Sequence, residues 1–172
     1  TSSDPDGDTL TYKWEYRQPG SSSWVQFSTS RNPTLVVNVG GNWSIRLTVT
    51  DDSGGSDTVT KTITANRAPN ADFTWSPGSP QVGNTLSFSN TSSDPDGDAL
   101  TYRWEYRQPG SSSWVQFSTA RNPTLPVSTG GTWQIRLTVW DGKGGSDSVT
   151  KSIFVNTPPN ANFTWSPSIP LV

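Results

Sequence analysis

The sequence contains no cysteine, no histidine and no methionine. Without cysteine and histidine it has no disulfides, no Ser-His-Asp or Cys-His catalytic arrangement and no zinc site of the usual ligands. The absence of methionine leads us to expect an internal or processed segment, with any signal peptide or anchor outside it. No run of 18 apolar residues is present, so we predict no membrane span in this segment.

Charge is also scarce. Charged residues make up 15% of the chain, the net charge is −2 and the pI is near 4.9, so no basic surface for nucleic acid is expected. The only glutamates, Glu15 and Glu105, stand between basic neighbours at outward positions of predicted strands. We interpret them as solvated cross-strand ion pairs, and we predict that the protein is not an enzyme.

The chain repeats itself. Residues 1–82 return as residues 91–172, and 61 of the 82 pairs are identical. A period of 90 residues is about the size of one small β-domain. We predict a domain at 1–67 that lacks its first two strands and a complete domain at 68–157. Residues 158–172 are then the first strand of a following repeat, or a strand donated to another domain.

Apolar and polar residues alternate along short segments of the complete repeat, and turn residues separate these segments. This pattern predicts strands over residues 71–76, 85–89, 100–107, 114–117, 124–127, 132–140 and 147–155. The fifth belongs at a sheet edge, because Pro126 cannot donate a ladder hydrogen bond. Seven short strands without a helical period predict an all-β, immunoglobulin-like sandwich.

Four motifs resemble the polycystic-kidney-disease (PKD) repeat. They are Asn-Ala-Asp-Phe-Thr-Trp-Ser-Pro from residue 70, Ser-Phe-Ser-Asn-Thr-Ser-Ser-Asp-Pro-Asp-Gly-Asp from 87, Thr-Tyr-Arg-Trp from 101, and residues 131–139 followed by Asp141. One departure is Trp104-Glu-Tyr-Arg-Gln-Pro-Gly110, where the family usually has Trp-Asp-Phe-Gly-Asp-Gly. The resemblance implies tandem PKD-type β-sandwiches that act as extracellular spacers or adhesion modules, on cell-surface proteins or beside secreted hydrolases.

The acidic loop of residues 94–98 is a candidate metal site. Asp94, Asp96 and Asp98 place three carboxylates at alternate positions, and Asp141 is the expected fourth ligand for a hard cation such as Ca²⁺. The family resemblance adds Asn70. The equivalents in the first copy are Asp4, Asp6, Asp8 and Asp51. The alternative interpretation is a plain turn in which Asp98 caps backbone amides.

The tryptophans fall into two groups. Trp104 and Trp133 have inward parity and are predicted core residues, as is Trp75. Trp140 breaks the inward parity of its strand, so it is expected to be exposed. Exposed tryptophans can stack on sugars or anchor an interface, which makes Trp24, Trp114 and Trp140 candidate binding residues. The alternative is that they pack against a loop or a neighbouring domain.

Two hypotheses for function follow. The first is a structural module of an extracellular or cell-surface repeat array, such as a stalk, an adhesin shaft or a filament. Its partners would be neighbouring copies, end to end, with strand complementation as one mode of contact. The second is an accessory module of a secreted hydrolase that binds cell-surface or matrix polysaccharide, or protein.

Overall fold

The computed structural model describes residues 2–166. Within them it assigns eleven strands and no helix, and therefore no helix long and apolar enough to cross a membrane. The strands are β1 (Thr11–Arg17), β2 (Val25–Ser28), β3 (Gly41–Thr50), β4 (Ser56–Ala65), β5 (Phe73–Ser76), β6 (Thr85–Asn90), β7 (Thr101–Arg107), β8 (Val115–Ser118), β9 (Thr124–Pro126), β10 (Gly131–Trp140) and β11 (Ser146–Val155).

Residues 68–157, the C-terminal unit, form a sandwich of two antiparallel sheets. One sheet has the order β11-β10-β7-β8 and the other has the order β5-β6-β9. This confirms the all-β, immunoglobulin-like fold class. Each strand predicted in this unit is present, with ends that differ by no more than two residues. The strand that contains Pro126 lies at a sheet edge, as its missing N–H requires.

Alternation along the strands builds the core of the C-terminal unit. Every second residue of β10 points inward and is almost completely buried: Trp133, Ile135, Leu137 and Val139. Aromatic rings from the two sheets meet at the centre, where the Trp104 ring lies 5.0 Å from Phe73 and 5.3 Å from Phe88. The prediction that Trp104 and Trp133 are core residues is confirmed, and Trp75 packs partly buried against the same core.

Residues 2–67, the N-terminal unit, form one sheet in the order β2-β1-β3-β4. Its register copies that of the C-terminal unit, since Trp14 pairs with Leu47 as Trp104 pairs with Leu137. No second sheet covers it among residues 2–67, and Val59 and Ile63 are therefore 46% and 43% exposed.

The counterpart of β9 shows what the second sheet contributes. Residues 34–36 form no strand, and Val36 is 85% exposed, although valine favours strands more than the Pro126 that replaces it in β9. β9 pairs only with β6, and the N-terminal unit has no described strand in that place. The strand at this position therefore depends on a partner and not on propensity.

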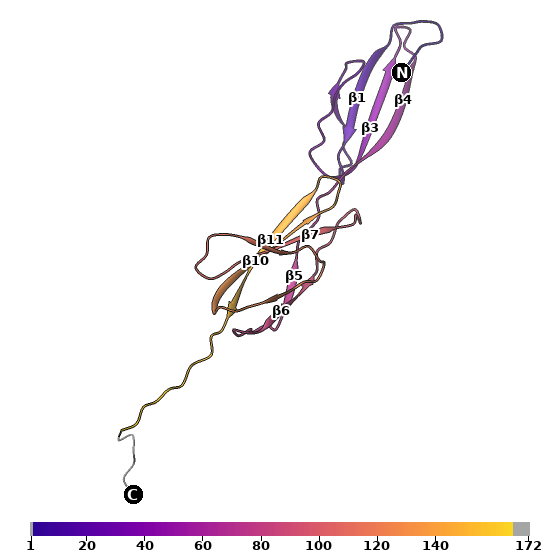
Figure 1. Cartoon of the computed structure of the whole chain (residues 1–172). Coiled ribbons are helices and arrows are strands. Elements are labelled where there is room, and N and C mark those ends of the chain that lie inside the picture. The colour runs from indigo at the N-terminus through magenta and orange to yellow at the C-terminus, as the bar shows by residue number, and fades with distance from the viewer. Residues whose placement is uncertain (1, 167–172) are drawn as a thin grey trace.

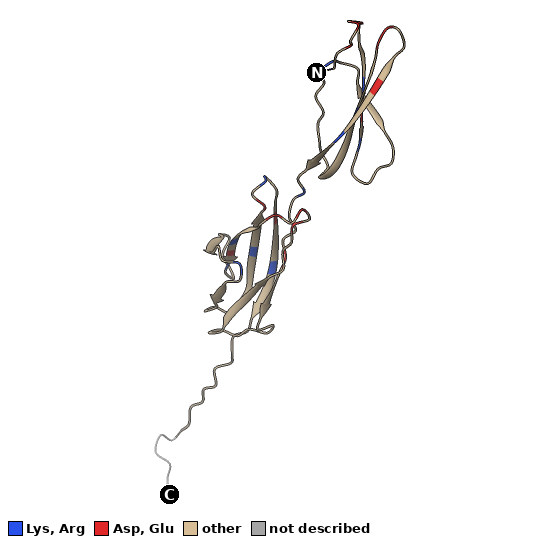
Figure 2. Ribbon diagram, turned by 90° about the vertical axis from the view of Figure 1, so that its right-hand side faces the viewer, with Lys and Arg blue, Asp and Glu red and all other residues tan. Residues whose placement is uncertain are grey.

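The two units lie end to end, as two views at right angles show (Figures 1 and 2). The chain leaves β4, crosses a short linker and enters the C-terminal unit beside its acidic loops (Figure 2). Residues 158–166 continue away from the opposite end, belong to no strand and are exposed. Their role as a strand of another domain stays a prediction, and residues 167–172 of that stretch lie outside the described residues.

Candidate functional site at the junction of the two units

The loop of residues 94–98 is a tight turn organised by its first aspartate. Asp94 Oδ1 accepts hydrogen bonds from the backbone amides of Asp96 (2.8 Å) and Asp98 (3.2 Å). Gly97 has a φ of 80°, a left-handed conformation that glycine adopts without strain. The expectation that Asp98 caps the amides is wrong. Asp94 does so, because it stands at the start of the turn, where the following N–H groups point back at its side chain.

Asp141 organises the adjacent loop after β10. It is 4% exposed, and its Oδ1 accepts the amides of Lys143 (2.7 Å) and Gly145 (2.9 Å). A Cβ on Gly145 would collide with this carboxylate and lie 2.9 Å from the Cα of Ala68, at the start of the unit. The loop can therefore approach the incoming chain this closely only with glycine at position 145.

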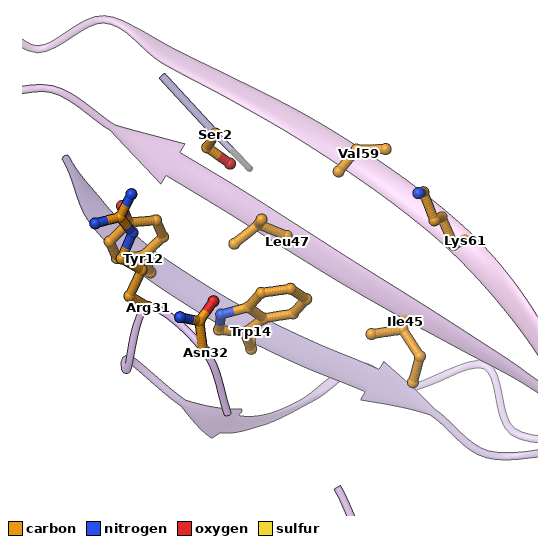
Figure 3. A pocket seen from close by; sticks show the side chains of 9 residues that line it. All are labelled: Ser2, Tyr12, Trp14, Arg31, Asn32, Ile45, Leu47, Val59 and Lys61. Carbon is orange, nitrogen blue, oxygen red and sulfur yellow. The ribbon is translucent and has the colours of Figure 1, made fainter. Parts of the chain in front are cut away.

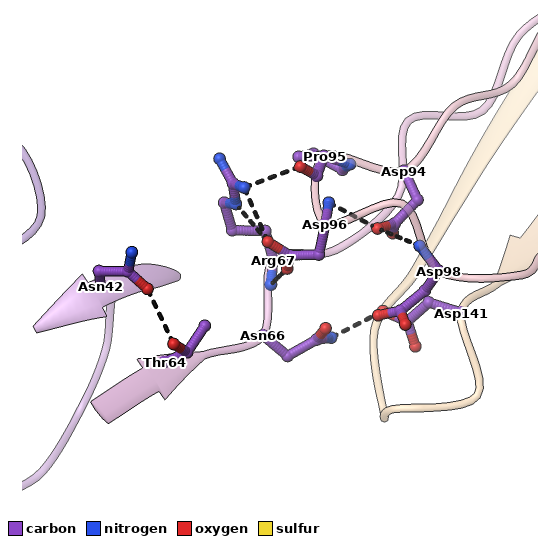
Figure 4. A network of polar contacts seen from close by, with 9 residues as sticks. All are labelled: Asn42, Thr64, Asn66, Arg67, Asp94, Pro95, Asp96, Asp98 and Asp141. Carbon is purple, nitrogen blue, oxygen red and sulfur yellow. Dashed lines mark hydrogen bonds and ion pairs between the residues drawn. The ribbon is translucent and has the colours of Figure 1, made fainter. Parts of the chain in front are cut away.

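The linker inserts two side chains between these loops (Figure 4). Asn66 Nδ2 donates to Asp141 Oδ2 (2.7 Å). The backbone N–H of Arg67 donates to Asp96 Oδ2 (2.7 Å), and its guanidinium pairs with Asp96 Oδ1 (2.7 Å). Arg67 Nη2 also donates to the carbonyl of Pro95 (2.7 Å). One arginine thus binds both the carboxylate and the backbone of the acidic loop, a directional arrangement that a lysine could not reproduce.

These contacts shift the acidity of both carboxyls. The backbone amide and the guanidinium of Arg67 lower the pKa of Asp96 below its ordinary value. The side-chain amide of Asn66, with help from the amides of Lys143 and Gly145, lowers the pKa of Asp141. Both groups are therefore ionised at neutral pH, which keeps the linker contacts charge-assisted.

The structure brings three of the five ligands predicted in the C-terminal unit together, and Asp141 is not in the group. Carboxylate oxygens of Asp94, Asp96 and Asp98 lie within 4.8 Å of one another, and Asp94 Oδ2 is buried without a hydrogen-bond partner among the described residues. Asn70 lies at the base of the loop, where its backbone exchanges hydrogen bonds with Ser93. The set fits a cation only in part, because Arg67 already supplies positive charge to Asp96.

Sequence reasoning missed Asn66 and Arg67. It assigned these two residues no role and sought function in the acidic loops and at the tryptophans. A signal was available, because the equivalent of Arg67 is Thr157, one of the few places where the two copies differ in charge. An isolated arginine two residues after a long strand shows no pattern, however, and its partner Asp96 lies 29 positions away.

The same loops recur in the N-terminal unit, but without a described linker between them. Asp4 Oδ1 accepts the amides of Asp6 (2.8 Å) and Asp8 (3.2 Å), and Asp51 Oδ1 accepts those of Ser53 (2.9 Å) and Gly55 (2.7 Å). The Ser53 hydroxyl bridges the two loops by donating to Asp8 Oδ2 (3.2 Å). The loop shape is therefore intrinsic to the sequence, and the linker contacts are added to it.

The candidate binding tryptophans are stacked against arginines on the outer faces of the sheets. The Arg46 guanidinium lies 4.2 Å from the Trp24 ring, Arg136 lies 4.3 Å from Trp114, and Arg103 lies 5.2 Å from Trp140. All three tryptophans are half-buried. These cation–π contacts leave less of each ring open to a ligand than full exposure would.

The two glutamates differ from expectation. Glu15 and Glu105 are 6% and 9% exposed and are therefore buried, although both were interpreted as solvated. Each pairs with arginine of the neighbouring strand, Glu15 with Arg46 (2.8 Å) and Glu105 with Arg136 (2.9 Å). The stacked tryptophans cover those arginines, so the outer face buries charge that alternation alone places in solvent. The hydrogen bonds from Lys13 and Arg46 hold the pKa of Glu15 below its ordinary value.

The family model for the PKD domain matches residues 70–154. These residues belong to the PKD family. Over 153 residues the chain is 33% identical to the pre-pro-metalloprotease PrtV of Vibrio cholerae serotype O1, an alignment that covers 87% of this chain and 15% of PrtV. It is 30% identical over 140 residues to the dyslexia-associated protein KIAA0319-like protein of Mus musculus, which covers 72% of this chain and 13% of that protein.

The solved PKD1 domain of Vibrio anguillarum Epp is 28% identical and covers 54% of this chain and 99% of that domain, with a TM-score of 0.42. The chain spans about 15% of the length of the curated Vibrio relative that it matches. A PKD domain is a non-catalytic module, so the match describes an accessory part of such proteins and not their chemistry.

Proposed function

We propose that this chain is a structural module of an extracellular protein, in which PKD-type units follow one another end to end as a stalk or shaft. The observation that carries the proposal is the junction itself. Asn66 and Arg67 fasten the linker to two separate loops of the next unit. PKD domains occur in secreted proteins such as PrtV, which supports an extracellular location.

The linker contacts resist bending between the two units. Pro69 restricts the backbone, while the contacts to Asp96 and Asp141 hold the linker on both sides of its entry point. Fixing a segment at two well-separated points limits rotation more than one contact could. A junction held in this way transmits orientation from one unit to the next, which a flexible linker of similar length does not.

Spin labels at two introduced cysteines test this stiffness, since the chain has no cysteine of its own. Thr60 on β4 and Thr150 on β11 are exposed equivalents, one in each unit. We expect one narrow distance distribution, which becomes broad when Asn66 and Arg67 are both replaced by alanine. Gln108→Ala is the control, because Gln108 is exposed and follows β7, at the end of that strand opposite the acidic loop that precedes it. A distribution that is already broad with the junction intact contradicts the proposal.

A binding role beside a secreted hydrolase is the second candidate, and the protease relative favours it. Trp140 and Phe154 lie on the outer face of the same sheet, and Phe154 is 67% exposed. We expect that a binding module would be retained on an insoluble polysaccharide or an extracellular-matrix protein, and that Trp140→Ala would release it. Retention unchanged by Trp140→Ala, Trp114→Ala and Trp24→Ala contradicts a site at these tryptophans.

We also propose that Ca²⁺ binds the acidic loops and adds to their rigidity. The support is the partnerless, buried Asp94 Oδ2 together with the neighbouring carboxylates of Asp96 and Asp98. Asp141 and Asn70 complete the set in the C-terminal unit, and Asp4, Asp6, Asp8 and Asp51 are the equivalents.

Arg67 makes this proposal testable, because it competes with any cation for Asp96. Ca²⁺ should raise the melting temperature, and Arg67→Ala should increase that rise by removing the competing charge. Asp94→Asn should reduce it. A melting temperature that is the same with Ca²⁺ and with chelator, in both the unchanged chain and Arg67→Ala, excludes a stabilising site.

A further inference from the structure

Basic side chains gather on the outer faces of the two four-stranded sheets. The outward positions of these sheets hold six of the 12 basic residues of the chain and only two of its 14 acidic residues. Glu15 and Glu105 are the acidic ones, and the basic ones are Lys13, Arg17, Arg46, Arg103, Arg107 and Arg136. Most other acidic residues lie in loops, several of them at the junction of the two units (Figure 2). Each outer face, with three basic side chains and one acidic side chain, is therefore positive on a chain whose net charge is −2.

Alternation along the strands separates this charge from the apolar side of each sheet. In the N-terminal unit Trp14, Ile45 and Leu47 point to the inner face, where they help to line a hollow of about 450 Å³ (Figure 3). Glu15 and Arg46 alternate with them along β1 and β3 and lie on the other side of the sheet. The positive face is thus separate from the core side, and both units have one.

On the outer face of the C-terminal unit, Arg103 is held in position but not neutralised. Glu105 accepts a hydrogen bond from Arg136 Nε (2.9 Å), while Arg103 reaches the same carboxylate only at 3.4 Å. Arg103 makes no hydrogen bond among the described residues, and its side chain is 41% exposed. Its guanidinium lies 5.2 Å from the Trp140 ring, and a stacked guanidinium keeps N–H groups at its edge for an anion.

A row of hydroxyl side chains lies beside these basic residues. Arg136 on β10 pairs in register with Thr150 on β11, and Trp140 pairs with Ser146. The exposed outward residues of β11 before Phe154 are Ser146, Ser148, Thr150 and Ser152. Hydroxyl groups both donate and accept hydrogen bonds, as sugar hydroxyls do. Positive charge, an aromatic ring and hydroxyls therefore lie side by side on one surface.

We propose that the outer face of the sheet β11-β10-β7-β8 binds an acidic polysaccharide, a glycan chain that carries carboxylate or sulfate groups. Arg103 and Arg136 contact the anionic groups, Trp140 packs against a sugar ring, and the hydroxyl row of β11 bonds to sugar hydroxyls. This rests on the binding role proposed above as the second candidate, and it gives that role a ligand class.

The charge of this face fits a polysaccharide better than a nucleic acid. Duplex DNA carries about one negative charge per 1.7 Å of its axis, and the domains that bind it are usually strongly basic. Here the pI is near 4.9, and the basic residues of one face number three. The charges of an acidic polysaccharide are separated by whole sugar units, a lower density that a few fixed arginines can match.

The outer face of the N-terminal unit is a reduced form of the same surface. It has Lys13 in place of Arg103 and Thr50 in place of Trp140, so it lacks this stacked pair. We expect it to bind the same ligand more weakly. The N-terminal sheet accommodates lysine and threonine at these positions in the same register. The double variant Arg103→Lys with Trp140→Thr therefore preserves the fold while it removes the stacked pair.

Affinity electrophoresis with two matched pairs of polysaccharides tests the ligand class. Dextran sulfate against dextran tests sulfate, and polygalacturonate against its methyl ester tests carboxylate. We expect at least one charged polysaccharide to retard the chain and neither neutral one to do so. The retardation should decrease as salt is added, because salt screens charges at an exposed surface.

Substitutions locate the surface. Arg103→Gln should weaken binding about 10-fold or more, because a hydrogen bond to a charged group is worth about that factor, and the double variant should weaken it as well. Arg121→Gln is the matched control, since it removes the same charge from an exposed position in the loop between β8 and β9, which connects the two sheets. It should leave binding unchanged.

Several results would overturn the inference. Equal weakening by Arg103→Gln and Arg121→Gln would do so, as would binding of single-stranded DNA as tight as that of either charged polysaccharide. Equal retardation by charged and neutral polysaccharides would overturn the ligand class and leave the binding role standing. Retardation by none of the four would overturn the inference, while the stiffness of the junction is measured separately.

Discussion

The same sheet occurs twice in this molecule, once covered by a second sheet and once bare. The sequences of the two sheets are almost the same, and so are their registers. Yet Leu137, Ile135 and Val139 are fully buried, whereas their counterparts in the N-terminal unit are half-exposed. Local sequence therefore sets strand, register and outer-face chemistry, while burial of the inner face depends on what packs against it.

The largest difference between the two units is expected when the central tryptophan of each sheet is replaced. Trp104→Ala should lower the free energy of unfolding of the C-terminal unit by about 3–5 kcal/mol, because it removes a fully buried ring from a closed core. Trp14→Ala should cost the N-terminal unit about 1 kcal/mol, since its ring borders an open hollow. Denaturation monitored by hydrogen exchange of each sheet measures both. Equal costs would mean that the inner face of the N-terminal unit is closed in solution.

A smaller difference in stability is expected between substitutions of the equivalent residues Lys151 and Lys61. Lys151→Met should cost about 1–2 kcal/mol, reduced by the partial exposure of its ion pair, because it leaves the Phe73 carbonyl without its donor. Lys61→Met should change the stability of a dilute sample by less than about 0.5 kcal/mol, since Lys61 has no partner to lose among the described residues. Thermal melts of the two variants, compared with the unchanged chain, measure the contrast. A cost at Lys61 equal to that at Lys151 would refute it.

The smallest expected effect is the pH dependence of the acidic loops, because only the C-terminal unit has a linker bound to them. The pKa of Asp96 is lowered in the folded state, so its contribution is present above the ordinary pKa of an aspartate, about 3.9, and is lost as pH falls through the lowered value. Acidification below pH 4 should therefore broaden the distance distribution between the units. Asp96→Asn should make that distribution broad at every pH, and a distribution that stays narrow in acid would contradict the role of this carboxylate.

Much of the fold could be predicted from the sequence, because alternation and turn residues are local signals. The strands of the C-terminal unit, the edge position of Pro126 and the buried Trp104 all followed from them. Burial of Glu105 did not, because it depends on an arginine of the next strand and a tryptophan stacked above that arginine. Alternation assigns a residue to the outer face, but it does not show that other side chains cover it.

The candidate site was predicted in the same uneven way. Asp94, Asp96 and Asp98 come together because they share one turn, which sequence spacing describes well. Their partners Asn66 and Arg67 come from the preceding unit, and only the relative placement of two units brings them there. Contacts that depend on domain orientation have no local sequence pattern, so Asn66 and Arg67 were not predicted as part of the site.

The contacts of Arg67 have a consequence for the resistance of the chain to proteolysis. The bond after an arginine in an exposed linker is the ordinary target of trypsin-like proteases, whose specificity pocket must receive the guanidinium. Here that group is already bound by Asp96 and by the carbonyl of Pro95. Arg67 therefore orients the two units and also protects the peptide bond that follows it from such proteases. Loss of the Arg67 contacts would expose this bond to cleavage.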